Sequence, residues 1–308
     1  MIPRARPTAM GEAYTSVADD ANAIYWNTAG LAILRKNEFV AMRAELFQGL
    51  EYNFFAFAHP TKSWGTFAIG LSNLNITGIE QRTADTDAPD STFSSNDSAY
   101  TLAYARKISF SGNPLLQEDD GGLQLGLGLK LIRQNIAGEV ANSVAADIGS
   151  IYRFAEWPLS LGLAVQNIGS SSKFKNESDP LPLTVKLGTS YRVGKEWGAS
   201  GVSPYGGSPE GRQSGQETGL LLSLDGNMPR DNDPSARLGT EFTRGWTENL
   251  GTSVRAGYQT GKSRQVEAAA SGVTAGAGVA YKFFSFDFAW IPYGSLGDTF
   301  RYSVKLRF

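Results

Sequence analysis

The chain has 308 residues, a formal net charge of −2 and an isoelectric point near 5.6, so it lacks the strongly basic character of nucleic-acid-binding proteins. It contains no cysteine, which excludes a disulfide framework and thiolate metal sites. Hydrophobic residues make up 41% of the chain and the mean hydropathy is −0.23, and no stretch reaches the roughly 18 consecutive apolar residues of a transmembrane helix.

Residues 1–37 differ from everything that follows. The segment is small, polar and rich in alanine, and it shows no period of two. Ile24, Tyr25, Trp26 and Leu31 nevertheless favour burial. We expect a plug that folds into the lumen of a barrel; the alternative is a disordered periplasmic tail. Because its first residues lack the apolar stretch of a secretory signal, we expect a mature form from which that signal has been removed.

From Glu38 onward, apolar and polar residues alternate in many runs. In the run from residue 123 to 131, leucine occupies every odd position against Gln124, Gly126, Gly128 and Lys130. A strand alternates its side chains between two faces, and a membrane barrel turns the apolar face to lipid and the polar face to its lumen. The runs predict an all-β, transmembrane antiparallel barrel of about fourteen strands over residues 38–308. The expected spans are 38–48, 50–60, 63–74, 97–110, 121–135, 140–155, 158–168, 181–193, 217–228, 234–245, 248–260, 270–282, 284–292 and 298–308.

Connections at the two ends of the barrel should differ in length. With both termini in the periplasm, the long polar segment 75–96 and the segment 168–180 are predicted to be outer loops. Segment 194–216 is also long but falls on the periplasmic side. It is either a docking element or contains a strand pair that the pattern does not reveal.

The polar faces carry both glycine and charge. Small residues there let the wall approach a plug closely. Charges of both signs should pair across the lumen and with the plug, because unpaired buried charge is costly. The charged residues expected to face the lumen are Lys130, Asp147, Arg153, Lys186, Arg192, Asp225, Arg237, Glu241, Arg255, Lys282, Asp287, Arg301, Lys305 and Arg307.

One run breaks the alternation. Phe55 and Phe57 face opposite to Phe54 and are candidates to line an apolar pocket in the lumen with Tyr25 and Trp26. The alternative is that both phenylalanines simply pack the plug against the wall.

Catalysis and cofactor binding have little support. The single histidine, His59, precedes Pro60 at a predicted turn. No nucleophile elbow, zinc-protease motif or phosphate-binding loop occurs, so we expect no enzyme activity, no catalytic residues, no metal and no cofactor.

Four segments resemble a known family. They are Ala5–Tyr14, Asp19–Leu31, Leu224–Asp233 and Phe286–Phe308, and they are similar to the PorV/PorQ group of the FadL-like outer-membrane protein superfamily. Phe308, which closes the last strand, also resembles the C-terminal assembly signal of bacterial outer-membrane barrels.

The resemblance implies a plugged barrel of fourteen strands in the bacterial outer membrane. Asn27, Thr28, Ala29 and Gly30 correspond to an Asn-Pro-Ala-Gly motif of the lumenal hatch, with Thr28 in place of proline. Proline would fix φ and remove a donor, so Thr28 relaxes that constraint.

Two functions are implied. FadL-like members take up hydrophobic small molecules such as fatty acids, whereas PorV-like members accompany a protein secretion machine as docking or shuttle barrels. The implied partners are outer-membrane lipid, a hydrophobic ligand and a secretion or cell-surface protein complex. Fold alone does not choose between these functions.

Overall fold

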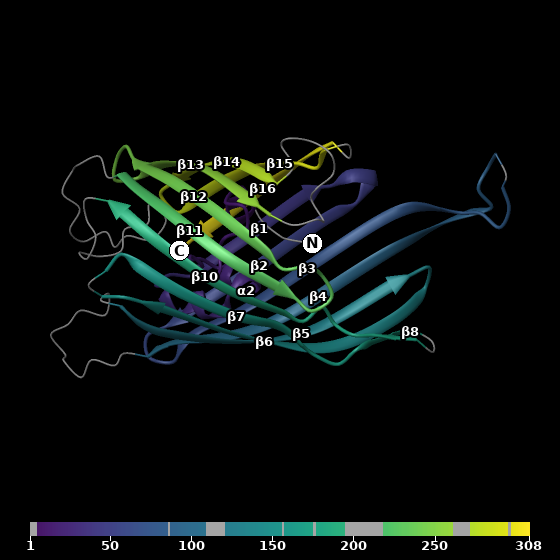
Figure 1. The fold of residues 1–308 in the computed structure, drawn as a ribbon, viewed down its shortest axis with the longest axis horizontal. Helices are drawn as coiled ribbons and strands as arrows, with labels where there is room; N and C mark the ends of the chain where they lie inside the picture. The colour runs from purple at the N-terminus through teal and green to yellow at the C-terminus, as the bar shows by residue number, and fades with distance from the viewer. Residues whose placement is uncertain are drawn as a thin grey trace.

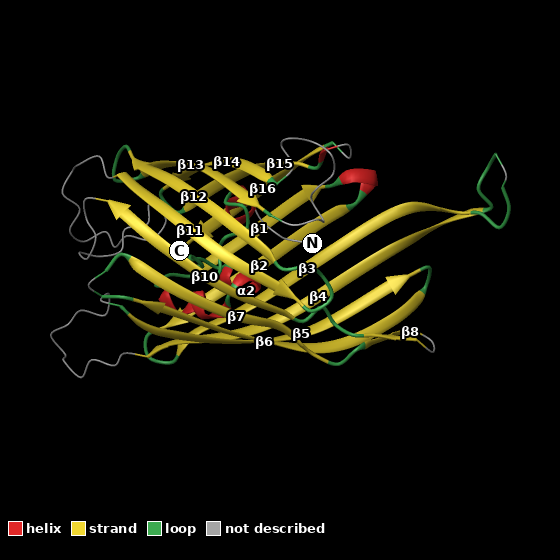
Figure 2. Cartoon of the chain, viewed as in Figure 1, coloured by secondary structure: helices red, strands yellow, loops and turns green. Residues whose placement is uncertain are grey.

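The polypeptide forms a closed antiparallel barrel of fourteen strands, as the alternation predicts (Figures 1 and 2). The structure, a computed structural model, describes residues 5–85, 87–108, 121–155, 157–174, 177–194, 218–260, 272–294 and 297–308. The barrel strands are β1 (Glu38–Glu45), β2 (Glu51–Thr61), β3 (Gly65–Gln81), β4 (Ser91–Ile108), β5 (Gly122–Ile136), β6 (Glu139–Arg153), β7 (Leu159–Gly169), β10 (Thr184–Gly194), β11 (Thr218–Pro229), β12 (Ser235–Gly245), β13 (Leu250–Gln259), β14 (Val273–Tyr281), β15 (Phe284–Pro292) and β16 (Asp298–Arg307).

Each barrel strand pairs with its neighbours in the chain, and β1 pairs with β16 to close the sheet. Closure leaves no free edge along the paired length of the wall. At the seam, the backbone N–H of Phe308 donates to the carbonyl of Asn37 at 3.0 Å, and Asn37 returns a bond of 2.9 Å. The chain terminus is therefore part of the closure.

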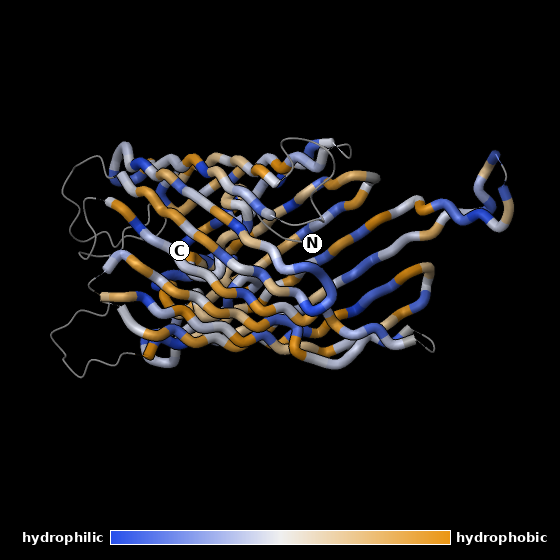
Figure 3. The backbone as a smooth tube through the Cα atoms, in the orientation of Figure 1, coloured by the Kyte–Doolittle hydropathy of each residue, from blue (hydrophilic) through white to orange (hydrophobic). Residues whose placement is uncertain are grey.

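The two faces of the wall have opposite character. On β5, Leu125, Leu127, Leu129 and Leu131 are exposed, whereas the alternate residue Lys130 is buried. The same alternation runs along the other strands, where hydrophobic and hydrophilic positions succeed one another (Figure 3). The barrel thus carries apolar side chains outward and polar side chains inward.

The predicted loop 75–96 is too long, because only the residues between Gln81 and Ser91 connect the two strands. β3 continues to Gln81 and β4 begins at Ser91, so the two strands extend as a ribbon well past their neighbours (Figure 1). Their pairing passes a register shift between Ile76 and Ile79. A ribbon that leaves the wall needs no apolar face, so its polar sequence resembles that of a loop.

Segment 168–180 also contains structure that was not predicted. The short strands β8 (Ser172–Phe174) and β9 (Glu177–Asp179) form a separate hairpin. Most of segment 194–216 lies outside the described residues.

Residues 5–37, here called the lumenal segment, lie inside the barrel (Figure 1). They include α1 (Ala5–Ala9), α2 (Ala23–Trp26) and the 3-10 helix η1 (Thr28–Ile33), while the short 3-10 helix η2 (Phe47–Gly49) joins β1 to β2. α1 contacts β13 to β16 and η1 contacts β2 to β6, so the segment spans the lumen. Among the described residues, none of the helices is long and apolar enough to cross a membrane.

Exchange of Leu129 for arginine tests whether the apolar face meets lipid. Leu129 lies mid-strand and is 54% exposed. In a bilayer, Leu129→Arg should lower the free energy of unfolding by about 2–4 kcal/mol. Thr92→Arg, on the ribbon outside the wall, should have little effect. Urea unfolding in lipid vesicles measures both, and an equal effect of the two variants would contradict a lipid-facing wall.

Candidate functional site in the barrel lumen

The lumenal segment lies directly against the backbone of the wall at several glycines. A Cβ atom on Gly257 would lie 1.9 Å from the Gly11 nitrogen, and one on Gly126 would lie 2.3 Å from the Ala29 nitrogen. No side chain fits at such distances. The prediction that small residues let the wall approach the lumenal segment is confirmed at these positions.

Arg6 is the main electrostatic link between the lumenal segment and the wall. Its Nε and Nη2 donate to the two carboxylate oxygens of Glu241, each at 2.8 Å. Its Nη1 donates to the Tyr14 hydroxyl at 2.7 Å and to the Asp19 carboxylate. All four side chains are almost fully buried, so each charge depends on its partner.

The ion-pair chain continues along the wall. Arg255 pairs with Glu241 and, at 2.7 Å, with Asp287. The remaining buried pairs between charged groups include Lys130–Asp147, Arg237–Glu12 and Lys305–Asp20, at 2.6, 3.3 and 3.5 Å. The predicted lumenal charges that make ion pairs, within the wall or with the lumenal segment, therefore include Lys130, Asp147, Arg192, Arg237, Glu241, Arg255, Asp287, Lys305 and Arg307. Lys282 is exposed in the β14–β15 turn, where its φ of 53° interrupts the alternation.

Burial and the ion pairs act on the titrating groups of the lumenal segment in opposite directions. Burial by itself would raise the pKa of Asp19, but the Arg6 guanidinium holds that pKa well below its usual range. Burial raises the pKa of the Tyr14 and Tyr25 hydroxyls. At neutral pH, Asp19 is therefore a carboxylate and both tyrosines are neutral.

Polar wall residues also hold the segment through its backbone. Asp225 Oδ2 accepts hydrogen bonds from the backbone N–H groups of Tyr14 and Thr15, at 2.9 and 2.7 Å. Arg301 donates to the Thr8 hydroxyl at 2.8 Å. Sequence reasoning placed these wall residues on the lumenal face but gave no sign of their partners, because the lumenal segment has no regular periodicity.

The four predicted hatch residues lie where η1 begins. The Asn27 Nδ2 group lies 2.8 Å from the Thr15 carbonyl oxygen and 3.1 Å from the Ser150 carbonyl oxygen of β6, and Asn27 Oδ1 accepts from the Ala29 N–H. A Cβ atom on Gly30 would lie 2.2 Å from the Ala18 carbonyl oxygen. The Thr28 hydroxyl is buried and has no hydrogen-bond partner among the residues that the structure describes, while its methyl group faces Gly128. Asn27 thus caps η1 and ties it to the wall.

The predicted pocket residues are only partly brought together. The Tyr25 ring meets the Trp26 ring edge-on, at 5.5 Å between centroids, and meets the Phe54 ring at 6.5 Å. Phe54, not Phe55 or Phe57, is buried against the lumenal segment.

Phe55 and Phe57 lie on the outer face, so neither the lumenal pocket nor the packing of these two residues against the plug holds. Phe55 is 42% exposed, and Phe57 stacks on Phe308 with 6.4 Å between ring centroids. Both line a hollow of about 560 Å³ with outward residues such as Ile69 and Leu102. The error has a physical cause: at β2 the lumenal face is also apolar because it meets Tyr25, so the sequence does not distinguish the two faces.

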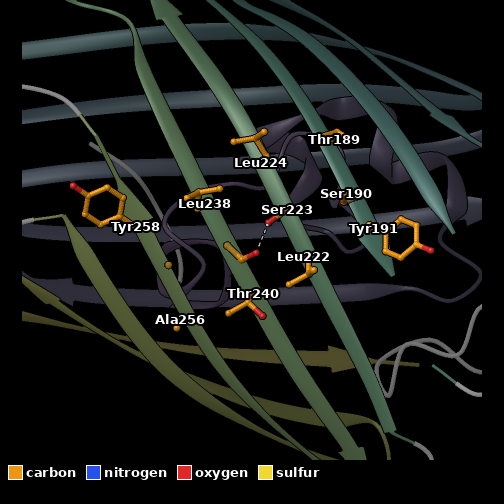
Figure 4. A pocket seen from close by; sticks show the side chains of 12 residues that line it. Thr189, Ser190, Tyr191, Leu222, Ser223, Leu224, Leu238, Thr240, Ala256 and Tyr258 are labelled. Atoms are coloured by element: carbon orange, nitrogen blue, oxygen red, sulfur yellow. Dashed lines mark hydrogen bonds between the residues drawn. The ribbon is translucent and has the colours of Figure 1, made fainter. Parts of the chain in front are cut away.

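A second hollow, of about 570 Å³, lies on the outer wall of β10 to β13 (Figure 4). Its sides are Leu222, Leu224 and Leu238, with Tyr191 and Tyr258 at its ends. Thr240 and Ala256 form the floor between these larger outward side chains. Both hollows are thus features of the apolar exterior rather than of the lumen.

Solved structures with a similar fold include two toluene transporters and a FadL homologue. The toluene transporter TodX of Pseudomonas putida has a TM-score of 0.54 and 11% identity, with 98% of this chain and 96% of TodX covered. The Ralstonia pickettii toluene transporter TbuX gives 0.52 and 10%, covering 98% and 97%. A Pseudomonas aeruginosa FadL homologue gives 0.51 and 12%, covering 99% of each chain.

The chain has the fold of the FadL-like barrels. No protein-family model matches the sequence, and no curated protein matches it either. The fold expected from the resemblance is confirmed, and the assignment to the PorV/PorQ group stays a prediction.

Replacement of Arg6 by alanine should release the lumenal segment. The change leaves Asp19 and Glu241 with fewer partners in a buried site, at an expected cost of about 3–5 kcal/mol. Hydrogen exchange in residues 5–37 measures the effect. Arg43→Ala, which breaks an exposed 2.8 Å pair with Glu51, is the control and should cost about 0–1 kcal/mol. Unchanged exchange in Arg6→Ala would show that the ion pairs do not hold the segment.

A single methyl group at Gly257 should also displace the segment. Gly257→Ala places Cβ on the backbone of Gly11, whereas Gly226→Ala meets nothing within 4 Å. Overpacking of this kind costs about 1–3 kcal/mol. We expect a lower thermal midpoint and faster exchange in residues 5–37 for Gly257→Ala alone. Equal behaviour of the two variants would mean that the close approach is not required.

Proposed function

We propose that the chain is a bacterial outer-membrane protein in which residues 38–308 form the membrane barrel and residues 1–37 form its plug. The outward apolar face supports this, and so does a set of exposed aromatic residues at one end. Trp64, Trp157, Trp246 and Phe283 lie in the turns at the end of the barrel that carries the C-terminal residue Phe308. Aromatic girdles of this kind mark membrane interfaces. In this proposal the ribbon of β3 and β4 points out of the cell, and Phe308 acts as the assembly signal.

We infer that the barrel carries hydrophobic small molecules. The observation that carries this proposal is the aromatic cluster of Tyr25, Trp26, Tyr52 and Phe54 on the lumenal side. Tyr25 is only partly buried there, whereas Trp26, Tyr52 and Phe54 are buried. TodX and TbuX are toluene transporters, which supports a hydrophobic cargo by analogy. In this reading Tyr25 and Trp26 contact the ligand, and the non-enzymatic character of the neighbours fits a carrier.

In this proposal Asn27, Thr28, Ala29 and Gly30 form the gate. They lie against β5 and β6, where backbone and side-chain contacts close the lumen. A solute that moves through the lumen has to displace this element. Because Thr28 stands in place of proline, the φ angle at the first residue of η1 is not fixed by a ring.

The second candidate is a docking or shuttle barrel that partners a secretion machine and carries no small molecule. The buried ion pairs around Arg6 favour it, because they stabilise a closed lumen. The ribbon of β3 and β4 would then offer a contact surface outside the membrane.

A reversible lock on the gate distinguishes the two candidates. The methyl group of Thr28 lies 3.3 Å from the position of a Cβ atom on Gly128, close enough for Thr28→Cys and Gly128→Cys to form a disulfide. The chain has no other cysteine. For a carrier, oxidation should abolish uptake of toluene by cells that make the variant, and reduction should restore it.

The single variant Thr28→Cys controls for the substitution itself. Uptake that is the same in oxidised and reduced cells would contradict transport through the gate. Native mass spectrometry of protein extracted in mild detergent adds an independent result: a retained hydrophobic molecule on a monomer supports the carrier, and a large co-purifying protein supports the docking barrel.

A further inference from the structure

The outer face of β1 to β6 changes from apolar to polar between two adjacent rows of cross-strand partners. Direct cross-strand partners point to the same face. One row of such partners is apolar in all six strands: Ala41, Phe55, Leu71, Tyr100, Leu131 and Val144. The next outward row, toward the ribbon, is polar in all six: Arg43, Asn53, Asn73, Ser98, Arg133 and Asn142.

The row beyond it is polar on β1 to β5 and apolar on β6. Its members are Glu45, Glu51, Asn75, Asn96, Asn135 and Val140. On β1 and β2 the charges neutralise one another, because Arg43 lies 2.8 Å from Glu51 and 3.7 Å from Glu45. The polar groups that remain available lie on β3 to β6.

These groups form a continuous surface, here called the amide patch: Asn73, Asn75, Asn96, Ser98, Arg133, Asn135 and Asn142. Asn73 donates to Ser98 at 3.0 Å and to Asn96 at 3.2 Å, and Asn96 donates to Asn75 at 3.4 Å. Within the part of the chain that the structure describes, Arg133 makes no ion pair. Among the described residues, the side-chain Oδ1 atom of Asn135 is buried without a hydrogen-bond partner. The patch thus combines hydrogen-bonded amides with one exposed cation, Arg133.

We propose that the amide patch binds the headgroup of a phosphorylated glycolipid in the outer leaflet of the membrane. This inference rests on the proposed location in the outer membrane, with the ribbon outward. The adjoining apolar row would hold the acyl chains, so the first groups that the patch meets are those of the headgroup.

The chemistry of the patch matches this ligand. An asparagine amide offers two donors and an acceptor, which complement sugar hydroxyl groups that both donate and accept. The guanidinium of Arg133 offers the paired donors that phosphate takes in bidentate form. A plain phospholipid would use Arg133 but has no sugar hydroxyl groups for the amides.

Native mass spectrometry tests the proposal on the full chain in detergent. The probes are purified lipopolysaccharide that carries lipid A and core sugars, and phosphatidylglycerol. Wild-type protein should bind the glycolipid more tightly than the phospholipid. Arg133→Gln should weaken glycolipid binding by about tenfold, as loss of a charge-assisted hydrogen bond would. The triple exchange Asn73→Ala, Asn96→Ala and Asn135→Ala should remove the preference for the glycolipid.

Arg106→Gln is the matched control. Arg106 is an exposed residue at the opposite end of β4, so the variant makes the same charge change on the other membrane side and should bind like wild type. Equal binding of both lipids by wild type, an equal effect of Arg106→Gln and Arg133→Gln, or occupation of the patch by a second copy or another protein would overturn the proposal. Resistance of the folded variants to SDS at room temperature verifies folding.

Failure of this inference differs from failure of the proposed function. If cell fractionation finds the protein outside the outer membrane, the location fails. If the protein lies in the outer membrane but shows no preference for the glycolipid, only the role of the amide patch fails. Toluene uptake by the Thr28→Cys, Gly128→Cys variant does not depend on the result for the amide patch.

Discussion

The buried pairing of Arg6 with Glu241 and Asp19 is the interaction on which the lumen depends. A guanidinium removed from water at the centre of a barrel is tolerated only with carboxylates in contact. Glu241 supplies one from the wall and Asp19 supplies another from the lumenal segment itself. Arg255 then joins Glu241 to Asp287 and carries the pairing across three strands. Wall and segment are therefore folded as one polar core, and neither has a satisfied set of charges without the other.

This polar core requires wall residues without side chains wherever the lumenal segment crosses the wall. Glycine meets this requirement at positions 126, 149 and 257, since a Cβ atom on Gly126, Gly149 or Gly257 would overlap the segment. The close approach is what brings backbone groups within reach of Asp225 and Asn27. Glycine content on the lumenal face and hydrogen bonding of the segment are thus two consequences of the same packing.

The barrel was predictable because period-two alternation is a strong and repeated signal. Strand number and the direction of most charged residues follow from it, as the burial of Lys130 and the exposure of Leu129 illustrate. The signal fails where both faces of a strand are apolar, as at Phe55 and Phe57. There the alternation does not show which face points outward, and only the pairing of β2 with β1 and β3 decides it. It also fails on the ribbon of β3 and β4, where neither face meets lipid or a core. The sequence could not predict the partners of Arg6 and Asn27, because both residues lie in the lumenal segment, which has no regular periodicity.

The proposed functions differ in what they require of the lumenal segment. A carrier has to loosen η1 from β5 and β6 in each cycle, which means breaking the bonds of Asn27 while the Arg6 pairs, near α1, stay intact. The two anchors contact different strands, since η1 meets β2 to β6 and α1 meets β13 to β16. Local opening on the η1 side is therefore structurally separable from release of the whole segment. A docking barrel needs neither motion, and a uniformly rigid segment would be its physical signature.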